Sequence, residues 1–289
     1  MSTVRIGTTA NLPPAAGVAD GIVERYWKLY VHPFRQSPDP AFVHESETFR
    51  EVLARILFDV VEVGGGLTLV TGEPGTGITT VLRTVASALP ETAFDVAFVV
   101  DPARSVTALL GTILVELGAR KLPRSRSGLM DLATSMLASM GKHGREAVVL
   151  VDEAHLLGSA QLEAIRRLMN IEANERKLLH IVLAGQPKLL MAVRRNESLD
   201  RRVTMRARLE PLGTVDGDRY LAHRVRVAGA ERDPFSPAAA ATIVRLAGGN
   251  ARRINAIAAS ALVAGAKARA VTITPAIVRA AALDGEETS

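Results

Sequence analysis

The stretch Leu67-Thr-Leu-Val-Thr-Gly-Glu-Pro-Gly-Thr-Gly-Ile-Thr-Thr80 decides the fold. Its first five residues predict a short strand, its glycines predict a tight loop, and the apolar spacing from Val81 to Leu89 predicts a helix. In this order, backbone N–H groups of the loop and the positive end of the helix converge on one point, which suits a phosphate. The residues predicted to bind nucleotide phosphates are Gly72, Glu73, Pro74, Gly75, Thr76, Gly77, Ile78, Thr79 and Thr80.

Ile78 stands where this pattern, G-x-x-x-x-G-K-[ST], has a lysine. The loop amides do not depend on that side chain, so we expect phosphate binding to survive. The ammonium group of the lysine neutralises charge as the terminal phosphoryl group leaves. By analogy with other charge stabilisers, its loss lowers the rate by about 10² to 10³ or more. Thr79 still offers its hydroxyl to Mg²⁺.

A second motif follows farther along the chain. Ala147 to Val151 is apolar throughout and predicts a buried parallel strand, which Asp152 and Glu153 follow. Ligands of open α/β sheets bind at the carboxyl ends of strands. One carboxylate for Mg²⁺ and a second to accept a proton from water are the pair that hydrolysis of a nucleoside triphosphate requires. Gln186 ends the next apolar strand, Leu178 to Ala184, and we expect it at the same edge.

Apolar strands that alternate with helices predict a parallel sheet covered by helices on both faces. The strand pattern stops near Leu212, and the cap-and-proline pair Ser236-Pro237 predicts a helical region after it. The predicted fold class is therefore α/β, a P-loop core followed by a small helical lid. The predicted domains are an N-terminal arm (1–44), an α/β nucleotide-binding domain (45–211) and a helical lid domain (212–289).

Composition narrows the class of protein. Among 289 residues there is no cysteine, which excludes a disulfide scaffold, thiolate-held zinc and a cysteine nucleophile. The first residues lack the basic and apolar regions of a secretory signal. The best apolar candidate for a membrane span, Ile254 to Ala266, is shorter than the roughly 20 residues that a bilayer requires. We therefore expect a soluble, cytoplasmic protein without a membrane span.

Two groups of basic residues are candidates for contacts with phosphates, in a chain of net charge +5. The first group lies in one predicted loop between helices and contains Arg120, Lys121, Arg124 and Arg126. The second follows the strand of Gln186 and contains Arg194, Arg195, Arg201, Arg202, Arg206 and Arg208. Each group is either a solvated face or a contact for DNA. For the second group, an alternative is an arginine supplied to the γ-phosphate of a neighbouring subunit.

Taken together, these residues resemble the AAA+ ATPase domain of the ExeA/GspA family, which is related to type II secretion and to transposition helpers of the TnsC kind. The resemblance extends from about Pro33 to Leu283. It rests on Pro33-Phe34, Pro38-Asp39-Pro40 and Phe42, on Thr71-Gly-Glu-Pro-Gly-Thr-Gly with Thr79-Thr80, on Leu150-Val-Asp-Glu-Ala-His-Leu-Leu157, on Ile181-Val-Leu-Ala-Gly-Gln-Pro187, on Arg224-Val-Arg-Val-Ala-Gly229, and on Gly248-Gly249 with Arg252, Ile254 and Asn255.

The resemblance implies an AAA+ core that binds ATP and Mg²⁺. By this resemblance Thr79 and Asp152 would hold Mg²⁺, Glu153 would activate water, and Gln186 would be the first sensor. Arg252 would be the second sensor, at the γ-phosphate.

The resemblance also implies an arginine finger that acts across a ring interface, and either Arg201 or Arg202 would be that finger. Two positions depart from the family pattern. Ile78 replaces the lysine, which bears on hydrolysis, and Ala251 replaces a proline, which bears only on local rigidity.

The first hypothesis is an ATPase whose ATP-dependent assembly into a homo-oligomeric ring or filament regulates a partner. That partner is a transposase or another protein on double-stranded DNA, and Ile78 impairs hydrolysis. The second hypothesis is a non-catalytic adaptor, a pseudo-ATPase. The third is a secretion-related ATPase whose membrane part resides in another chain. Five residues of the family pattern are retained, and their retention favours a nucleotide site that is still in use. They are Thr79, Asp152, Glu153, Gln186 and Arg252.

Overall fold

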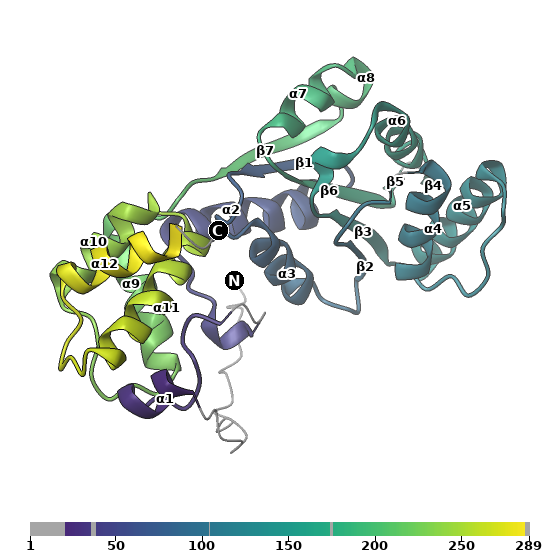
Figure 1. Ribbon diagram of the computed structural model, residues 1–289. Coiled ribbons are helices and arrows are strands. Elements are labelled where there is room, and N and C mark those ends of the chain that lie inside the picture. The colour runs from purple at the N-terminus through teal and green to yellow at the C-terminus, as the bar shows by residue number, and fades with distance from the viewer. Residues whose placement is uncertain (1–20, 36–38, 104, 174–175, 287–289) are drawn as a thin grey trace. The chain divides into compact units, whose positions relative to one another are not determined.

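The computed structural model describes residues 21–35, 39–103, 105–173 and 176–286 (Figure 1). Residues 1–20 of the predicted arm, and its Pro38, lie outside the described residues. The chain forms two compact units. One contains Val43–Gly217 and Ala247–Arg253, and the other contains Met1–Phe42, Asp218–Leu246 and Ile254–Ser289.

The first unit is built on a five-stranded sheet with the strand order β2-β3-β6-β1-β7, and every neighbouring pair is parallel. Its strands are β1 (Leu67–Gly72), β2 (Phe94–Val99), β3 (Glu146–Val151), β6 (Leu179–Gly185) and β7 (Val203–Leu209). A separate antiparallel pair joins β4 (Glu172–Ala173) and β5 (Arg176–Lys177). The sheet confirms the predicted α/β class.

Helices cover both faces of this sheet, as predicted (Figure 1). Val149 packs with α4, α5 and α6 on one face, whereas the next residue, Leu150, packs with α2 and α3 on the other. The helical segments of this unit are α2 (Glu47–Phe58), the π-helix η2 (Asp59–Val63), α3 (Ile78–Ala88), α4 (Val106–Glu116), α5 (Arg126–Lys142), the 3₁₀ turn η3 (Ala154–Leu156), α6 (Ser159–Leu168), α7 (Lys188–Arg194) and α8 (Glu197–Asp200).

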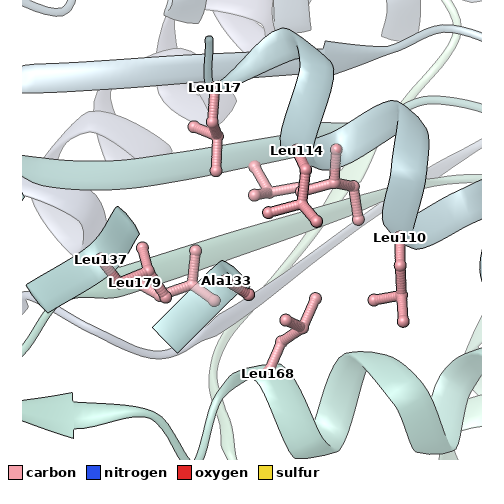
Figure 2. Close-up of a pocket in the computed structure, with 9 residues that line it drawn as sticks. Leu110, Leu114, Leu117, Ala133, Leu137, Leu168 and Leu179 are labelled. Atoms are coloured by element: carbon pink, nitrogen blue, oxygen red, sulfur yellow. The ribbon is translucent and has the colours of Figure 1, made fainter. Parts of the chain in front are cut away.

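A small void lies between the sheet and the helices α4, α5 and α6 (Figure 2). Its volume is about 10 Å³, and all the side chains around it are apolar. A void of that size holds at most one water, and this lining offers a water no hydrogen bond. It is therefore part of the core and not a ligand site.

The second unit is helical. Its segments are α1 (Ile22–Trp27), the 3₁₀ turn η1 (Pro40–Phe42), α9 (Thr214–Val227), α10 (Pro237–Ala247), α11 (Ala251–Lys267) and α12 (Pro275–Glu286), of which α9, α10 and α11 have one end in the first unit. The predicted cap of α10 is present, because Ser236 Oγ accepts a hydrogen bond from the N–H of Ala239 at 3.2 Å. Within the described ranges no helix has the length and hydropathy of a membrane span.

The strand β7 is absent from the sequence-based expectation. Its residues VTMRARL alternate, and the outward positions carry Arg206 and Arg208. That alternation is typical of a half-buried edge strand. We interpreted the arginines as part of a basic group, and this interpretation obscured the alternation of Val203, Met205, Ala207 and Leu209.

Candidate nucleotide-binding site

Three neighbouring strands end at one edge of the sheet, and each delivers a predicted motif there. β1 continues into the glycine loop, β3 into Asp152 and Glu153, and β6 into Gln186. Because β6 lies between β1 and β3 and all are parallel, their carboxyl ends lie together. The sheet order therefore brings together residues that are far apart in sequence.

The loop after β1 has the backbone conformation that a phosphate cradle requires. Gly75 and Gly77 have φ angles of +87° and +108°, which side chains other than hydrogen strongly disfavour. The hydroxyl of Thr76 donates to the carbonyl of Glu73 at 2.8 Å and closes the turn. α3 then begins at Ile78, so its free N–H groups face the loop.

The two predicted Mg²⁺ ligands are in direct contact. The hydroxyl of Thr79 donates to Oδ2 of Asp152 at 2.5 Å. The side chain of Asp152 is buried, and its Oδ1 accepts the N–H of Glu153 at 2.8 Å. Hard oxygen ligands of this kind suit Mg²⁺, which typically takes one or two protein oxygens and completes its shell with phosphates and water. The donor set therefore fits the ion that the sequence implied.

Glu153 has an unusual backbone conformation. Its φ angle is +49°, in the left-handed region that a non-glycine residue seldom adopts. Such conformations persist where the surrounding structure enforces them, and they concentrate at functional sites. About half of its side chain is exposed, so its carboxylate is accessible to water.

Ile78 packs against the apolar core under the loop. Its half-buried side chain contacts the cluster that contains Val70, Val81 and Leu209. Its Cδ1 would lie 3.1 Å from a Cβ built on Gly72. This position therefore contributes packing and no positive charge.

The segment of the first unit around the start of α11 also holds the loop. The side-chain amide of Asn250 donates to the carbonyl of Pro74 at 2.6 Å, and the N–H of Arg252 donates to the carbonyl of Gly75 at 3.2 Å. The Asn250 Oδ1 also accepts the N–H of Arg253, as a helix cap does. A Cβ at Gly75 would lie 2.8 Å from the Cβ of Arg252, so the close approach requires glycine there.

Asn250 is a site residue that sequence reasoning missed. The available signal was its type, because asparagine immediately before a helix is a preferred cap. That it also reaches the loop depends on tertiary structure. The guanidinium of Arg252 is exposed and has no partner among the described residues.

The other predicted arginines lie at different places. Arg201 is exposed just after α8, and its guanidinium has no partner within the described ranges. The guanidinium of the half-buried Arg202 donates to the side chain of Asn170. Arg206 is paired with Asp200 at 2.7 Å.

The first basic group lies between α4 and α5, as predicted. Arg120, Lys121 and Arg124 are exposed in the loop, whereas Arg126 is half-buried at the start of α5. Among the described residues, no hydrogen bond or ion pair joins this loop to the motifs at the carboxyl edge.

Comparison with known proteins identifies the family of the chain. A family of AAA domains matches residues 61–192. General secretion pathway protein A of Aeromonas hydrophila is 39% identical over 246 residues, which are 83% of this chain and 44% of that protein. The chain thus spans less than half the length of this relative.

Solved structures share the fold at low identity. Cdc6p of Pyrobaculum aerophilum has a TM-score of 0.69 at 20% identity and covers 87% of this chain and 70% of its own. The ORC1 protein of Aeropyrum pernix, solved in complex with DNA, has a TM-score of 0.61 at 19% identity, covering 86% and 68%. The fold and the family match place the chain in the AAA+ class of P-loop proteins. Within that class, the chain belongs to the ExeA/GspA family.

Proposed function

We propose that this chain binds Mg-ATP at the edge formed by β1, β6 and β3, and that nucleotide-dependent assembly lets it regulate a partner, with slow hydrolysis. The observation that carries the proposal is the 2.5 Å bond between Thr79 and Asp152. It joins the phosphate loop to the acidic motif in the arrangement that phosphoryl transfer requires.

The residues divide the work as follows. The N–H groups of Gly75 to Thr79 bind the β- and γ-phosphates. Thr79 and Asp152 hold Mg²⁺, which when bound neutralises phosphate charge. Glu153 accepts a proton from the attacking water, and Gln186 contacts the γ-phosphate from the end of β6.

Arg252 supplies positive charge that Ile78 lacks. Its backbone is hydrogen-bonded to Gly75 and its guanidinium is unpaired among the described residues. Arg252 can contact the γ-phosphate and so contribute to nucleotide binding. It does not occupy the position of the ammonium group that is absent at residue 78. We therefore expect binding to be nearly normal and turnover to be slow.

Replacing Ile78 with lysine tests the proposal. Phosphate release by Ile78→Lys should exceed that of the wild type by about 10²-fold, because one well-placed charge stabiliser is worth 10² to 10³ in rate. Ile78→Met, which restores length without charge, should leave turnover at the wild-type rate. The affinity for a fluorescent ATP analogue, measured in parallel, should change little in either variant.

The alternative is a non-catalytic adaptor, and the core packing of Ile78 is the observation that favours it. It would replace the first proposal if Ile78→Lys bound ATP without faster phosphate release. Absence of ATP binding by the wild type would exclude the first proposal and leave the adaptor.

The partner we propose is a transposase or another protein on double-stranded DNA. Support comes from the exposed basic loop between α4 and α5 and from the likeness to an ORC1 protein solved with DNA. A role in secretion is the competing proposal, since the curated relative is a general secretion pathway protein. We propose a homo-oligomer because an exposed arginine such as Arg201 completes such sites from a neighbouring subunit.

A further inference from the structure

The imidazole of His155 lies between two functional groups of the site. His155 belongs to η3, two residues after Glu153, and only 3% of its side chain is exposed. Its Nδ1 lies 3.2 Å from Oε2 of Glu153. The backbone N–H of Gln186 donates to the same nitrogen at 3.3 Å. One ring atom therefore faces both the proposed base and the end of β6.

Gly185 makes this position accessible to the ring. A Cβ at Gly185 would lie 2.9 Å from Nδ1 and 3.1 Å from the backbone nitrogen of His155. Real side chains almost never come that close, so any other residue would push the imidazole away from the strand. Glycine as the last residue of β6 therefore leaves room for the imidazole of His155.

The two contacts of Nδ1 exclude each other chemically. An imidazole nitrogen carries either a lone pair or a proton, so Nδ1 either accepts from Gln186 or donates to Glu153. Burial lowers the pKa of His155, Lys188 lowers it further, and the carboxylates of Glu153 and Asp152 oppose both effects. The ring is therefore neutral near pH 7, and the choice is between its two tautomers.

We propose that His155 is a positioning residue for Glu153. With the proton on Nδ1, the ring holds the carboxylate; with the proton on Nε2, it releases the carboxylate and accepts the N–H of Gln186. While Oε2 is held by the ring, the other oxygen of the carboxylate is free to accept a proton from water, and release leaves the carboxylate without a fixed orientation. A movement at Gln186, where the γ-phosphate would bind, thereby changes how firmly Glu153 is held. This inference rests on the proposed role of Glu153 as the base.

The tautomer can be measured in the nucleotide-free, full-length chain. The ¹⁵N chemical shifts of histidine ring nitrogens distinguish the two tautomers, and loss of one signal pair in His155→Asn assigns that pair. Glu153→Gln should shift the pair toward the Nε2–H form, because the new amide can donate to Nδ1. Glu91→Gln, an exposed carboxylate elsewhere, should leave it unchanged. An unchanged His155 pair in Glu153→Gln would overturn the proposal.

Turnover provides the second readout, measured in the Ile78→Lys background. His155→Phe keeps a ring without nitrogens, and we expect kcat to fall about tenfold, a part of the 10² to 10⁴ that a positioned base supplies. His155→Asn places an amide near Nδ1 and should recover most of kcat. The dissociation constant of ATP should be the same in both variants, and the exposed His143→Asn should have no effect.

The outcomes separate the two proposals. Equal kcat in His155→Phe and the parent, or equal loss in His155→Phe and His155→Asn, would contradict a positioning role. If Ile78→Lys itself shows no turnover, the proposed function fails, and the ¹⁵N spectrum of the nucleotide-free protein still decides whether His155 and Glu153 are coupled.

Discussion

At position 78, an aliphatic side chain packs on the apolar core where the phosphate-binding pattern has an ammonium group. The neighbouring residues keep their chemistry, because Thr79 bonds directly to Asp152 and Glu153 remains accessible to water. On the proposed function, loss of one charge with retention of the oxygen ligands should lower turnover more than binding. The positive charge that the proposal requires would come from Arg252 of the same chain or from an arginine of a neighbouring subunit.

The two candidates for that neighbouring arginine differ in their surroundings. Arg201 is exposed and unpaired within the described residues, whereas Arg202 is held by Asn170. In the Ile78→Lys background we expect Arg201→Ala to reduce ATP turnover by about 10³-fold or more, as loss of an arginine finger does. Arg202→Ala should have a small effect. Phosphate release by each variant measures this, and a larger loss in Arg202→Ala would reverse the assignment.

If Arg201 acts on a neighbouring subunit, its variant should be rescued in mixtures. Arg201→Ala retains its own Asp152 and Glu153, and a Glu153→Gln chain retains Arg201. Mixed oligomers should therefore regain turnover that neither variant has alone. If the turnover of a mixture is no more than the sum of its two inactive variants, the arginine acts within its own chain or not at all.

At the scale of elements, the loop after β1 is held by the segment that begins α11. The side chain of Asn250 has two functions there: its amide donates to Pro74 and its oxygen caps the helix. A loop whose carbonyls are already bonded loses less conformational entropy when it binds phosphate. The contact lies within the first unit, which includes Ala247–Arg253.

Asn250→Ser separates the two functions, because serine retains a capping oxygen but cannot reach Pro74. One net hydrogen bond is worth about 0.5 to 1.5 kcal/mol, so the dissociation constant of ATP should rise about 2- to 13-fold. Titration with a fluorescent ATP analogue measures this. Ser236→Ala removes only the cap of α10 and serves as the control; an equal loss of affinity in both variants would point to a general effect on stability.

Arg224 joins the N-terminal arm to α9 in the helical unit. Its guanidinium is buried, donates to the carbonyl of Pro33 at 2.7 Å and to that of Arg35 at 3.2 Å, and lies 5.0 Å from the ring centre of Phe42. The arm motif and the Arg224 motif, which we used as separate marks of the family, are thus in contact with one another. A buried guanidinium that makes several such contacts stabilises the unit strongly.

Arg224→Met should therefore lower the free energy of unfolding by about 2 to 4 kcal/mol, since it leaves buried carbonyls without donors. It should also accelerate trypsin cleavage after Arg25 and Lys28 in the arm. Urea unfolding and timed proteolysis measure the two effects. Arg226→Met, at an exposed position on the same helix, is the matched control. Unchanged arm cleavage in Arg224→Met would show that other contacts suffice to hold the arm.

At the scale of the whole molecule, the net charge of +5 is modest and basic residues occur along the whole chain. The loop between α4 and α5 presents Arg120, Lys121 and Arg124 to solvent. A phosphate backbone would release counterions there, so its affinity must fall steeply with salt. This dependence distinguishes a DNA contact from a face that is merely solvated.

Triple replacement of Arg120, Lys121 and Arg124 with alanine should weaken binding of duplex DNA in the presence of ATP. The slope of log affinity against log salt should decrease by about 0.9 for each lost phosphate contact. Fluorescence anisotropy between about 50 and 200 mM salt covers the range in which the change is large. The salt dependence of the triple variant is compared with that of a double variant in which Arg194 and Arg195 are replaced with alanine. An unchanged slope in the triple variant would place any DNA contact elsewhere.

Local pattern by itself determined the α/β class, the phosphate loop and the acidic motif. It could do so because these depend on residues close in sequence, as in the run from Leu67 to Thr80 or in the strand that ends at Asp152. It also predicted the cap of α10, because the cap bond spans only three residues. It did not predict β7, because the arginines of this strand drew attention away from its alternation of apolar and polar residues.

Only the tertiary structure decided which distant groups meet. Asn250 and Pro74 lie 176 positions apart, and His155 and Gln186 lie 31 apart. No local periodicity encodes such contacts, since they follow from the order of the strands and from close approaches at Gly75 and Gly185. Periodicity reports which face of an element is buried, whereas hydrogen bonds across the site depend on how those faces pack. The sequence thus predicted the class of chemistry, and packing decided which of the distant residues meet.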